Sequence, residues 1–214
     1  MRMRKKPNLT ARMERCEHLL IKQPEMFRGN WATAFQYNEL HIELGCGKGR
    51  FAVESAKMSQ DVFFVAVEKL TNVAISALEL ADSEGLQNLR VINALADNLP
   101  DYFAPCEASR IYLNFCDPWP LNRHAKRRLT NRRFLELYEQ VLEPEGEIHF
   151  KTDNLPFFKY SLDEFQSRGF VLLDINYDLH KTDVKCILTD YEIKFHSQGM
   201  PIYSAKCKLS GSSA

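Results

Sequence analysis

The sequence predicts an α/β fold in which helices cover both faces of a mostly parallel sheet. Strand-like apolar runs alternate with helical periods along most of the chain, which is the pattern of repeated βαβ units. The first strand-like run leads into a glycine-rich turn and a helix, whereas the last two are separated only by a turn-like segment. We therefore expect an antiparallel hairpin to close the sheet at its C-terminal end.

The individual elements follow from these periods in chain order. Strands are predicted near residues 40–44, 62–67, 89–93, 109–115, 146–151, 170–176, 187–195 and 202–208. Helices are predicted over Gly49–Met58, Asn72–Glu84, Asn131–Leu142 and Pro156–Arg168. The run 62–67 is apolar at every position, as expected of a strand that is buried on both faces of a parallel sheet.

The chain length fits one domain. With 214 residues and 45% hydrophobic content, the chain is long enough to bury one substantial core. No linker-like tract or internal repeat divides it. We expect a single domain over residues 1–214, in which residues 1–30 form a basic N-terminal arm or helix that leads into it.

Composition narrows the class of protein. The six cysteines lack C-x-x-C spacing, and no apolar segment resembles a signal peptide or a membrane span, so we expect a reduced, cytoplasmic protein. The six histidines show no metal-ligand spacing, and no metal site is expected.

The net charge is zero, yet thirteen of the 28 Lys and Arg residues lie in residues 1–22 and 123–133. Two basic segments on an acidic body indicate local recognition of a polyanion.

A glycine-rich loop follows the first predicted strand. Residues 43–50 read E-L-G-C-G-K-G-R, and Arg50 stands where a dinucleotide-binding motif has its third glycine. A phosphate loop is also absent, because no Lys-Ser/Thr pair follows. The order E-x-G-x-G-x-G is similar to the first motif of class I S-adenosylmethionine-dependent methyltransferases. Glu43, Gly45 and Gly47 are thus candidate cofactor-binding residues, the alternative being a structural glycine turn.

A second carboxylate supports a cofactor site. Glu68 ends the apolar run 62–67 and lies 23 residues after Gly45. In Rossmann-like folds an acidic residue about 20 positions beyond the glycine loop accepts hydrogen bonds from ribose hydroxyls. We expect this role for Glu68; the alternative is a solvated strand end.

A proline-rich ledge follows the fourth predicted strand at Asp117–Pro120. Strand carboxyl ends carry the ligands in open α/β sheets. Each proline favours an extended conformation of the residue before it, here Asp117 and Trp119. We expect a stiff ledge that presents a carboxylate and an aromatic face; the alternative is a turn that packs a core tryptophan.

A basic run follows the ledge almost at once. Its candidate RNA-binding side chains are Arg123, His124, Lys126, Arg127 and Arg128. Arg and Lys contacts to phosphate supply affinity without reading sequence, so the run suits a folded nucleic acid, although a solvated charged face is the alternative. The N-terminal basic segment is expected to be a second clamp or a disordered tail.

The ordered set of motifs resembles the bacterial tRNA (guanine-N7)-methyltransferases. The set comprises E-x-G-C-G-K-G-R, Glu68, N-F-x-D-P-W-P, R-H-x-K-R-R, K-T-D and T-x-Y-E, and it spans residues 43–192. The resemblance implies a class I methyltransferase fold with a mostly parallel seven-stranded sheet, S-adenosylmethionine as the cofactor, and tRNA as the partner of a monomer or homodimer. It implies methyl transfer to N7 of guanine 46 in the variable loop.

The resemblance also implies roles for individual residues. Asn93, Ala96 and Asp117 join the cofactor site, and Asp117 is the catalytic candidate. The substrate-binding candidates are Asp153, Thr189, Asp190, Tyr191 and Glu192. Guanine N7 has an outward lone pair and needs no general base, so catalysis rests on alignment, which contributes roughly 7–11 kcal/mol. A carboxylate stabilises the charge that develops on the base.

Two positions depart from the family pattern. Leu95 stands where the family usually has an acidic residue, and Leu121 stands where it typically has a lysine. We expect weaker cofactor or tRNA affinity, with Asn93, the Ala96 backbone or Asp97 replacing the first contact. Two alternatives remain open at this point. The chain acts on another RNA or on a protein, or it is a non-catalytic RNA-binding module.

Overall fold

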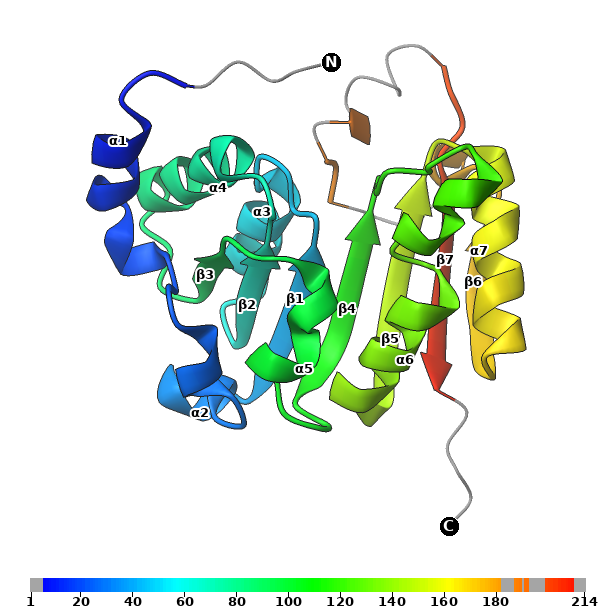
Figure 1. The fold of residues 1–214 in the computed structure, drawn as a ribbon, viewed down its shortest axis with the longest axis horizontal. Helices are drawn as coiled ribbons and strands as arrows, with labels where there is room; N and C mark the ends of the chain where they lie inside the picture. Colours follow the sequence, from blue (N-terminus) through cyan, green and yellow to red (C-terminus); the bar gives the residue numbers. More distant parts are fainter. Residues whose placement is uncertain (1–5, 182–186, 190, 193–198, 210–214) are drawn as a thin grey trace.

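The computed structural model describes residues 6–181, 187–189, 191–192 and 199–209, and its sheet has the order β3-β2-β1-β4-β5-β7-β6 in this part of the chain (Figure 1). The strands are β1 (Glu39–Leu44), β2 (Val62–Val67), β3 (Leu89–Ile92), β4 (Ala108–Asn114), β5 (Leu142–Thr152), β6 (Phe170–Asn176) and β7 (Tyr203–Leu209). Strands β1 to β5 pair in parallel, and β7 lies antiparallel between β5 and β6. The predicted mostly parallel seven-stranded sheet with an antiparallel C-terminal closure is confirmed.

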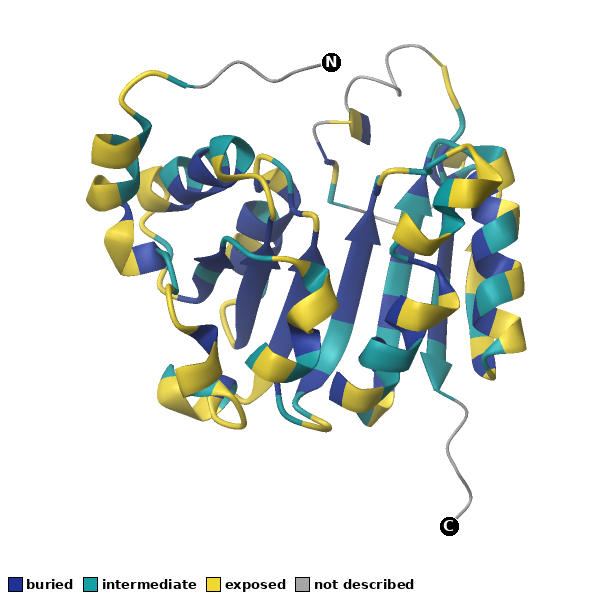
Figure 2. Cartoon of the chain, in the orientation of Figure 1, coloured by how far each residue is buried: buried dark blue, intermediate teal, exposed yellow. Residues whose placement is uncertain are grey.

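Helices cover both faces of this sheet. They are α1 (Leu9–Arg15), α2 (Trp31–Ala34), α3 (Arg50–Met58), α4 (Thr71–Ser83), α5 (Leu99–Tyr102), α6 (Arg132–Val141) and α7 (Leu155–Ser167). Short 3-10 turns are η1 (Glu17–Leu19), η2 (Pro24–Phe27), η3 (Ala96–Asn98), η4 (Asn122–Arg127) and η5 (Leu179–Lys181). One apolar cluster joins α3 and α4 to the sheet, and a second joins α2, α5, α6 and α7 to its other face. Figure 2 shows the buried strands between partly exposed helices.

Strand β2 shows why the sheet is buried on both sides. All of its residues are buried. Phe63, Val65 and Val67 belong to the cluster of α5 to α7, whereas Val62, Phe64 and Ala66 belong to the cluster of α3 and α4. Because side chains alternate along a strand, an uninterrupted apolar run can supply both clusters at once.

The four predicted helices begin and end within about one residue of α3, α4, α6 and α7. Side-chain caps explain two of the starts, since Asn131 accepts from the amide of Arg133 and Asn154 accepts from that of Phe157. The strand expected over 187–195 is wrong for the residues that can be described. Residues 187–189 pair with no strand, and residues 191–192 are helical. The antiparallel partners of β7 are instead β5 and β6.

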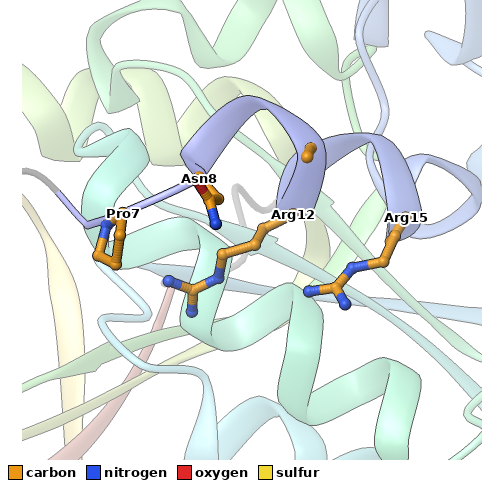
Figure 3. A pocket seen from close by; sticks show the side chains of 5 residues that line it. Pro7, Asn8, Arg12 and Arg15 are labelled. Atoms are coloured by element: carbon orange, nitrogen blue, oxygen red, sulfur yellow. The ribbon is translucent and has the colours of Figure 1, made fainter.

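From Lys6 onward the N-terminal arm is docked on the body. Arg12 Nε and Nη2 donate to the two oxygens of the Glu79 carboxylate, at 2.7 and 2.6 Å, and the amide of Ile21 donates to the carbonyl of Val91. A shallow cavity of about 410 Å³ lies beside α1, where Arg12 and Arg15 extend from the same side of the helix (Figure 3). The expectation of a disordered tail is therefore not met by the arm from Lys6 to Lys22.

None of the helices in the described part of the chain has the length and apolar character needed to cross a membrane. Within the same residues, no group of three or more His, Cys, Asp or Glu side chains is arranged to hold a metal ion.

Candidate active site

A cavity of about 770 Å³ opens at the carboxyl ends of β1, β2 and β4. The chain crosses from one side of the sheet to the other between β1 and β4, which is where open α/β sheets bind ligands. The predicted site residues that line the cavity are Glu43, Gly45, Gly47, Glu68, Ala96, Asp117, Arg127, Thr189 and Tyr191. Those outside its lining are Asn93, Arg123, His124, Lys126, Arg128, Asp153 and Glu192. Asp190 lies outside the described residues.

The glycine loop forms one wall of this cavity. The amide of Gly45 donates to the carbonyl of Val67 at 2.8 Å, which ties the start of the loop to the end of β2. Gly47 has φ 60°, and a Cβ there would meet open space. At Gly49, with φ 83°, a Cβ would lie 2.5 Å from that of Ala77. Gly47 thus leaves room on the ligand side, whereas Gly49 allows α3 to pack against α4.

Glu43 is the most deeply buried acidic residue of the cavity wall, with 4% of its surface exposed. Asn114 Nδ2 donates to its Oε1 at 3.0 Å. Burial raises the pKa of Glu43 to about 8, although the Asn114 hydrogen bond, the backbone amide of Ala52 and the nearby Lys151 act in the opposite direction. Glu43 Oε2 and Asn114 Oδ1 have no hydrogen-bond partner among the described residues. When Glu43 is ionised, each residue of this pair therefore has a buried acceptor without a hydrogen-bond donor among the described residues.

Glu68 connects the loops that follow β1 and β2. Its Oε2 accepts from the amide of Gly47 at 3.1 Å, and its Oε1 accepts from that of Leu70 at 2.9 Å. Asn93 lies behind it, since Asn93 Nδ2 donates to the Glu68 carbonyl at 2.7 Å and Asn93 Oδ1 accepts from the Thr71 hydroxyl. Asn93 thus supports the loop that carries Glu68.

Another part of the cavity wall contains Leu95, the departure that concerns an acidic contact, and Asp97, one of the residues expected to replace that contact. Leu95 lines the cavity and is half exposed. Asp97 also lines it, but its carboxylate binds Arg133 Nη2 at 2.6 Å. Ala96 lies between them on η3. The carboxylate nearest in sequence to Leu95 is therefore already paired.

The ledge Asp117–Pro120 lies at the end of β4, with Asp117 on the cavity wall. Trp119 has φ 41°, so the extended conformation predicted for it is wrong. Arg128 donates to the carbonyls of Pro118 and Trp119, at 2.9 and 3.0 Å, and the guanidinium of Arg127 lies 4.9 Å from the Trp119 ring. These contacts override the local preference that a following proline creates.

The basic run divides into two kinds of side chain. Arg123 and Lys126 are exposed on η4, as expected of phosphate contacts. The ring of His124 packs edge-on against Trp119, with centroids 5.7 Å apart. Arg128 departs from the expectation, because it is only 8% exposed and turns inward.

The T-x-Y-E segment is held by contacts within the protein. The Thr189 amide donates to Glu192 Oε2 at 2.7 Å, and the Glu192 amide donates to Thr189 Oγ1 at 3.1 Å, which is the reciprocal pattern of a capping box. Glu192 is fully buried and accepts from Lys151 Nζ at 3.1 Å. Tyr191 remains exposed at 57% and stacks on Phe115 with ring centroids 5.8 Å apart.

Sequence reasoning placed Asn114 and Lys151 inside motifs but gave them no role of their own. Both belong to strand ends, β4 and β5, that the parallel sheet brings next to Glu43 and to the T-x-Y-E segment. A polar residue at the carboxyl end of a parallel strand, where open α/β sheets bind ligands, was the signal that could have identified them. Asp153 follows β5 and forms no hydrogen bond or ion pair with the rest of the described chain.

Comparisons with known proteins agree with this architecture. A family model described as "Putative methyltransferase" matches residues 37–205. A relative from a Geobacillus species, named tRNA (guanine-N(7)-)-methyltransferase, is 45% identical over 210 residues, which cover 97% of this chain and 96% of the relative. A relative of the same name from Bacillus velezensis is 43% identical over 208 residues, which cover 96% of each chain.

Solved structures show the same fold at low sequence identity. A SAM-dependent methyltransferase from Aquifex aeolicus has a TM-score of 0.59 and 12% identity, over 92% of this chain and 97% of that one. A 16S rRNA (adenine(1408)-N(1))-methyltransferase from Catenulisporales acidiphilia has a TM-score of 0.61 and 15% identity, over 89% and 93% of the two chains. The Rossmann-like methyltransferase fold is confirmed.

Proposed function

Because this chain belongs to the tRNA (guanine-N7)-methyltransferase family, we propose that it transfers the methyl group of S-adenosylmethionine to N7 of guanine 46 in the variable loop of tRNA. We place the reaction in the cytoplasm, where such a substrate is found. The observation that carries the cofactor assignment is the pair of unpartnered acceptors beside the glycine loop.

The cavity wall fits the charge of such a methyl donor. When Glu43 is ionised, Glu43 Oε2 and Asn114 Oδ1 are buried acceptors without a donor among the described residues. An ammonium group supplies donors to both and favours the ionised form of Glu43. Gly45 and Gly47 leave the backbone open on the same side. Glu68 retains acceptor capacity for ribose hydroxyls, since each of its oxygens accepts a single backbone amide.

When bound, S-adenosylmethionine supplies an electrophilic methyl group on a sulfonium centre. The protein's part is to align guanine N7 with that methyl and to exclude competing geometries. Asp117, the first residue of the ledge, lies on the cavity wall, where its carboxylate stabilises the positive charge that develops on the guanine ring. No residue has to remove a proton before N7 attacks.

Two groups of residues serve the RNA. Arg123 and Lys126 on η4 are exposed and contact phosphates of the tRNA, while Arg127 and His124 hold the Trp119 ring. Stacking on an aromatic face is the usual way in which proteins bind an unpaired base.

On the substrate side, the exposed ring of Tyr191, already stacked on Phe115, offers a further face to the guanine. Asp153, Thr189 and Glu192 stay substrate-side candidates, together with Asp190. Thr189 and Glu192 act mainly through the position they give Tyr191, because their own polar groups bind each other.

The test is methyl transfer to a defined acceptor. Purified protein is incubated with methyl-labelled S-adenosylmethionine and two unmodified tRNA transcripts, one with guanine and one with 7-deazaguanine at position 46. We expect label only on the first transcript, because 7-deazaguanine has a carbon in place of N7. Equal labelling of both transcripts contradicts the N7 assignment. No labelling of either, despite tRNA binding, favours a binding module instead.

A further inference from the structure

Arg128 is a buried arginine inside an otherwise exposed basic run. It is 8% exposed, whereas Arg123, Lys126 and Arg127 are exposed. Its Nε donates to the Pro118 carbonyl at 2.9 Å, and its Nη2 donates to the Trp119 carbonyl at 3.0 Å. One guanidinium therefore binds two consecutive carbonyls of the ledge that begins at Asp117.

The ledge needs such a contact because of its backbone. Trp119 has φ 41° and Phe115 has φ 49°, so left-handed residues stand on both sides of Asp117. Side chains other than glycine disfavour this region, and it persists only where the surroundings hold it. The carbonyls of Pro118 and Trp119 are the groups whose direction sets this conformation, and Arg128 binds both.

The Arg128 guanidinium is in turn held by contacts with residues of α6 and α7. It lies 4.2 Å from the centroid of the Tyr160 ring on α7, and the Tyr160 hydroxyl accepts from Asn131 Nδ2 at 2.8 Å. Asn131 caps α6, and its amide donates to the Arg128 carbonyl at 2.9 Å. Helices α6 and α7 thus hold Arg128, and Arg128 holds the ledge. A lysine keeps the charge but has neither the planar fork nor the stacking face.

We infer that Arg128 is a positioning residue for methyl transfer, which sets the Asp117–Trp119 ledge against the cavity and takes no part in phosphate binding. The inference rests on the proposed function for its catalytic consequence. The basic run accordingly has two functions. Arg123 and Lys126 bind the polyanion, whereas Arg128 positions the ledge of the active site.

The kinetic test uses Arg128→Lys, with Arg168→Lys as a matched control at a partly buried arginine after α7 that binds Glu139 through two hydrogen bonds and does not line the cavity. For Arg128→Lys we expect kcat to fall by at least about tenfold, while tRNA affinity and its salt dependence stay within about twofold of the parent. The control should keep all three. An unchanged kcat with weaker tRNA binding identifies Arg128 as a phosphate contact and overturns the inference.

A second readout is independent of activity. The chain has two tryptophans, and Trp31 is completely buried, so quenching of fluorescence by acrylamide reports on Trp119. We expect Arg128→Lys to raise the quenching constant by about twofold with the melting temperature nearly unchanged. Unchanged quenching overturns the inference whatever the kinetics. This measurement also separates the two proposals, because a chain that methylates no tRNA still reveals whether Arg128 orders the ledge.

A third variant covers the case in which Arg128→Lys does not fold. Tyr160→Leu leaves Arg128 in place but removes the ring beneath its guanidinium. We expect an intermediate rise in Trp119 quenching and a fall in kcat of a few-fold, with tRNA affinity retained. A Tyr160→Leu protein with the parent's quenching and kcat contradicts the support that we assign to this pair.

Discussion

At the scale of single residues, Glu43 shows how a buried carboxyl can be kept ready for a cationic ligand. Its neighbours satisfy one oxygen and leave the other without a partner in the described chain. Burial raises its pKa to about 8, so at neutral pH the unliganded protein holds a proton there. An ammonium ligand reverses this preference, because opposite charges favour ionisation.

The first prediction follows from that linkage. Between pH 6 and 7.5, binding of S-adenosylmethionine should release close to one proton, and its affinity should rise by up to about tenfold per pH unit. Isothermal titration calorimetry in buffers of different ionisation enthalpy measures the released proton directly. Glu43→Gln should bind without releasing it. Equal proton release by both proteins assigns the titration to another group.

Trp119 shows the limit of reasoning from neighbours in sequence. A following proline favours extended backbone, yet Trp119 adopts φ 41°. Two hydrogen bonds from Arg128 to this ledge and the contact with Arg127 outweigh the preference for extended backbone.

At the scale of elements, two glycines of the glycine loop look alike in sequence but have different roles. Gly47 faces open space, whereas Gly49 touches α4 at Ala77. Both have positive φ, so a side chain is unfavourable at either position. Only at Gly49 would a side chain also clash with a neighbouring helix.

The second prediction compares the two alanine variants. Gly47→Ala should lower the free energy of unfolding by about 1–2 kcal/mol, the cost of positive φ alone, and should weaken S-adenosylmethionine binding. Gly49→Ala should cost about 2–5 kcal/mol, because overpacking against Ala77 adds to the same backbone term. Chemical denaturation and ligand titration of both variants supply the comparison. A Gly49→Ala protein as stable as Gly47→Ala would show that α4 moves away without cost.

The segment that contains Thr189 and Glu192 is a second element in which residues of one motif have different roles. Its capping box and the buried ion pair with Lys151 hold Tyr191 over Phe115. The polar groups of Thr189 and Glu192 are thereby used inside the protein, and Tyr191 lines the cavity.

The third prediction tests this ion pair. Glu192→Ala leaves the largely buried Lys151 ammonium with the Ile187 carbonyl but without its carboxylate, which should lower the free energy of unfolding by about 3 kcal/mol. The double variant Glu192→Ala/Lys151→Met removes both charges and should be the more stable of the two. Urea denaturation of the parent, both single variants and the double variant closes the cycle. Additive losses would mean that the two side chains do not depend on each other.

At the scale of the whole molecule, polar residues cross the sheet on the α3 and α4 side of β1, β4 and β5. His41 accepts or donates to Tyr112 and Glu39, and His149 contacts Glu147. Burial lowers the pKa of His41 to about 3 and that of His149 to about 4, and the nearby Arg110 acts in the same direction. The other charged groups that face His149 are Glu147 and Lys206.

The fourth prediction concerns stability in acid. A histidine whose folded pKa lies below its unfolded value stabilises the protein above about pH 6.5, and that stability is lost as the pH falls towards the folded value. Each such group contributes a slope approaching about 1.4 kcal/mol per pH unit. His41→Gln should therefore reduce the loss of unfolding free energy between pH 6.5 and 4.5, measured by urea denaturation. The same change at the exposed His18 should not, and an identical slope in all three proteins contradicts the assignment.

The arrangement of charge in the whole molecule matches what the sequence analysis expected only in part. The segment 123–127 is exposed at Arg123, Lys126 and Arg127, next to the cavity. In the N-terminal arm, Arg12 instead forms an ion pair with Glu79. Counting basic residues shows where positive charge is concentrated, but it cannot show which basic side chains are paired with a carboxylate on a distant helix.

The sequence by itself determined the α/β class, the positions of strands β1 to β7, the four longer helices, and the glycine loop with Glu68 after the next strand. These features depend on periodicity and on neighbours within a few residues, which a single chain displays directly. Only the tertiary structure decided that Asn114 meets Glu43, that Arg128 turns inward to the ledge, and that Lys151 pairs with Glu192. Except in the turn that contains Arg128, these partners are 41 or more residues apart. Their contact depends on the order of strands in the sheet, which local preferences do not encode.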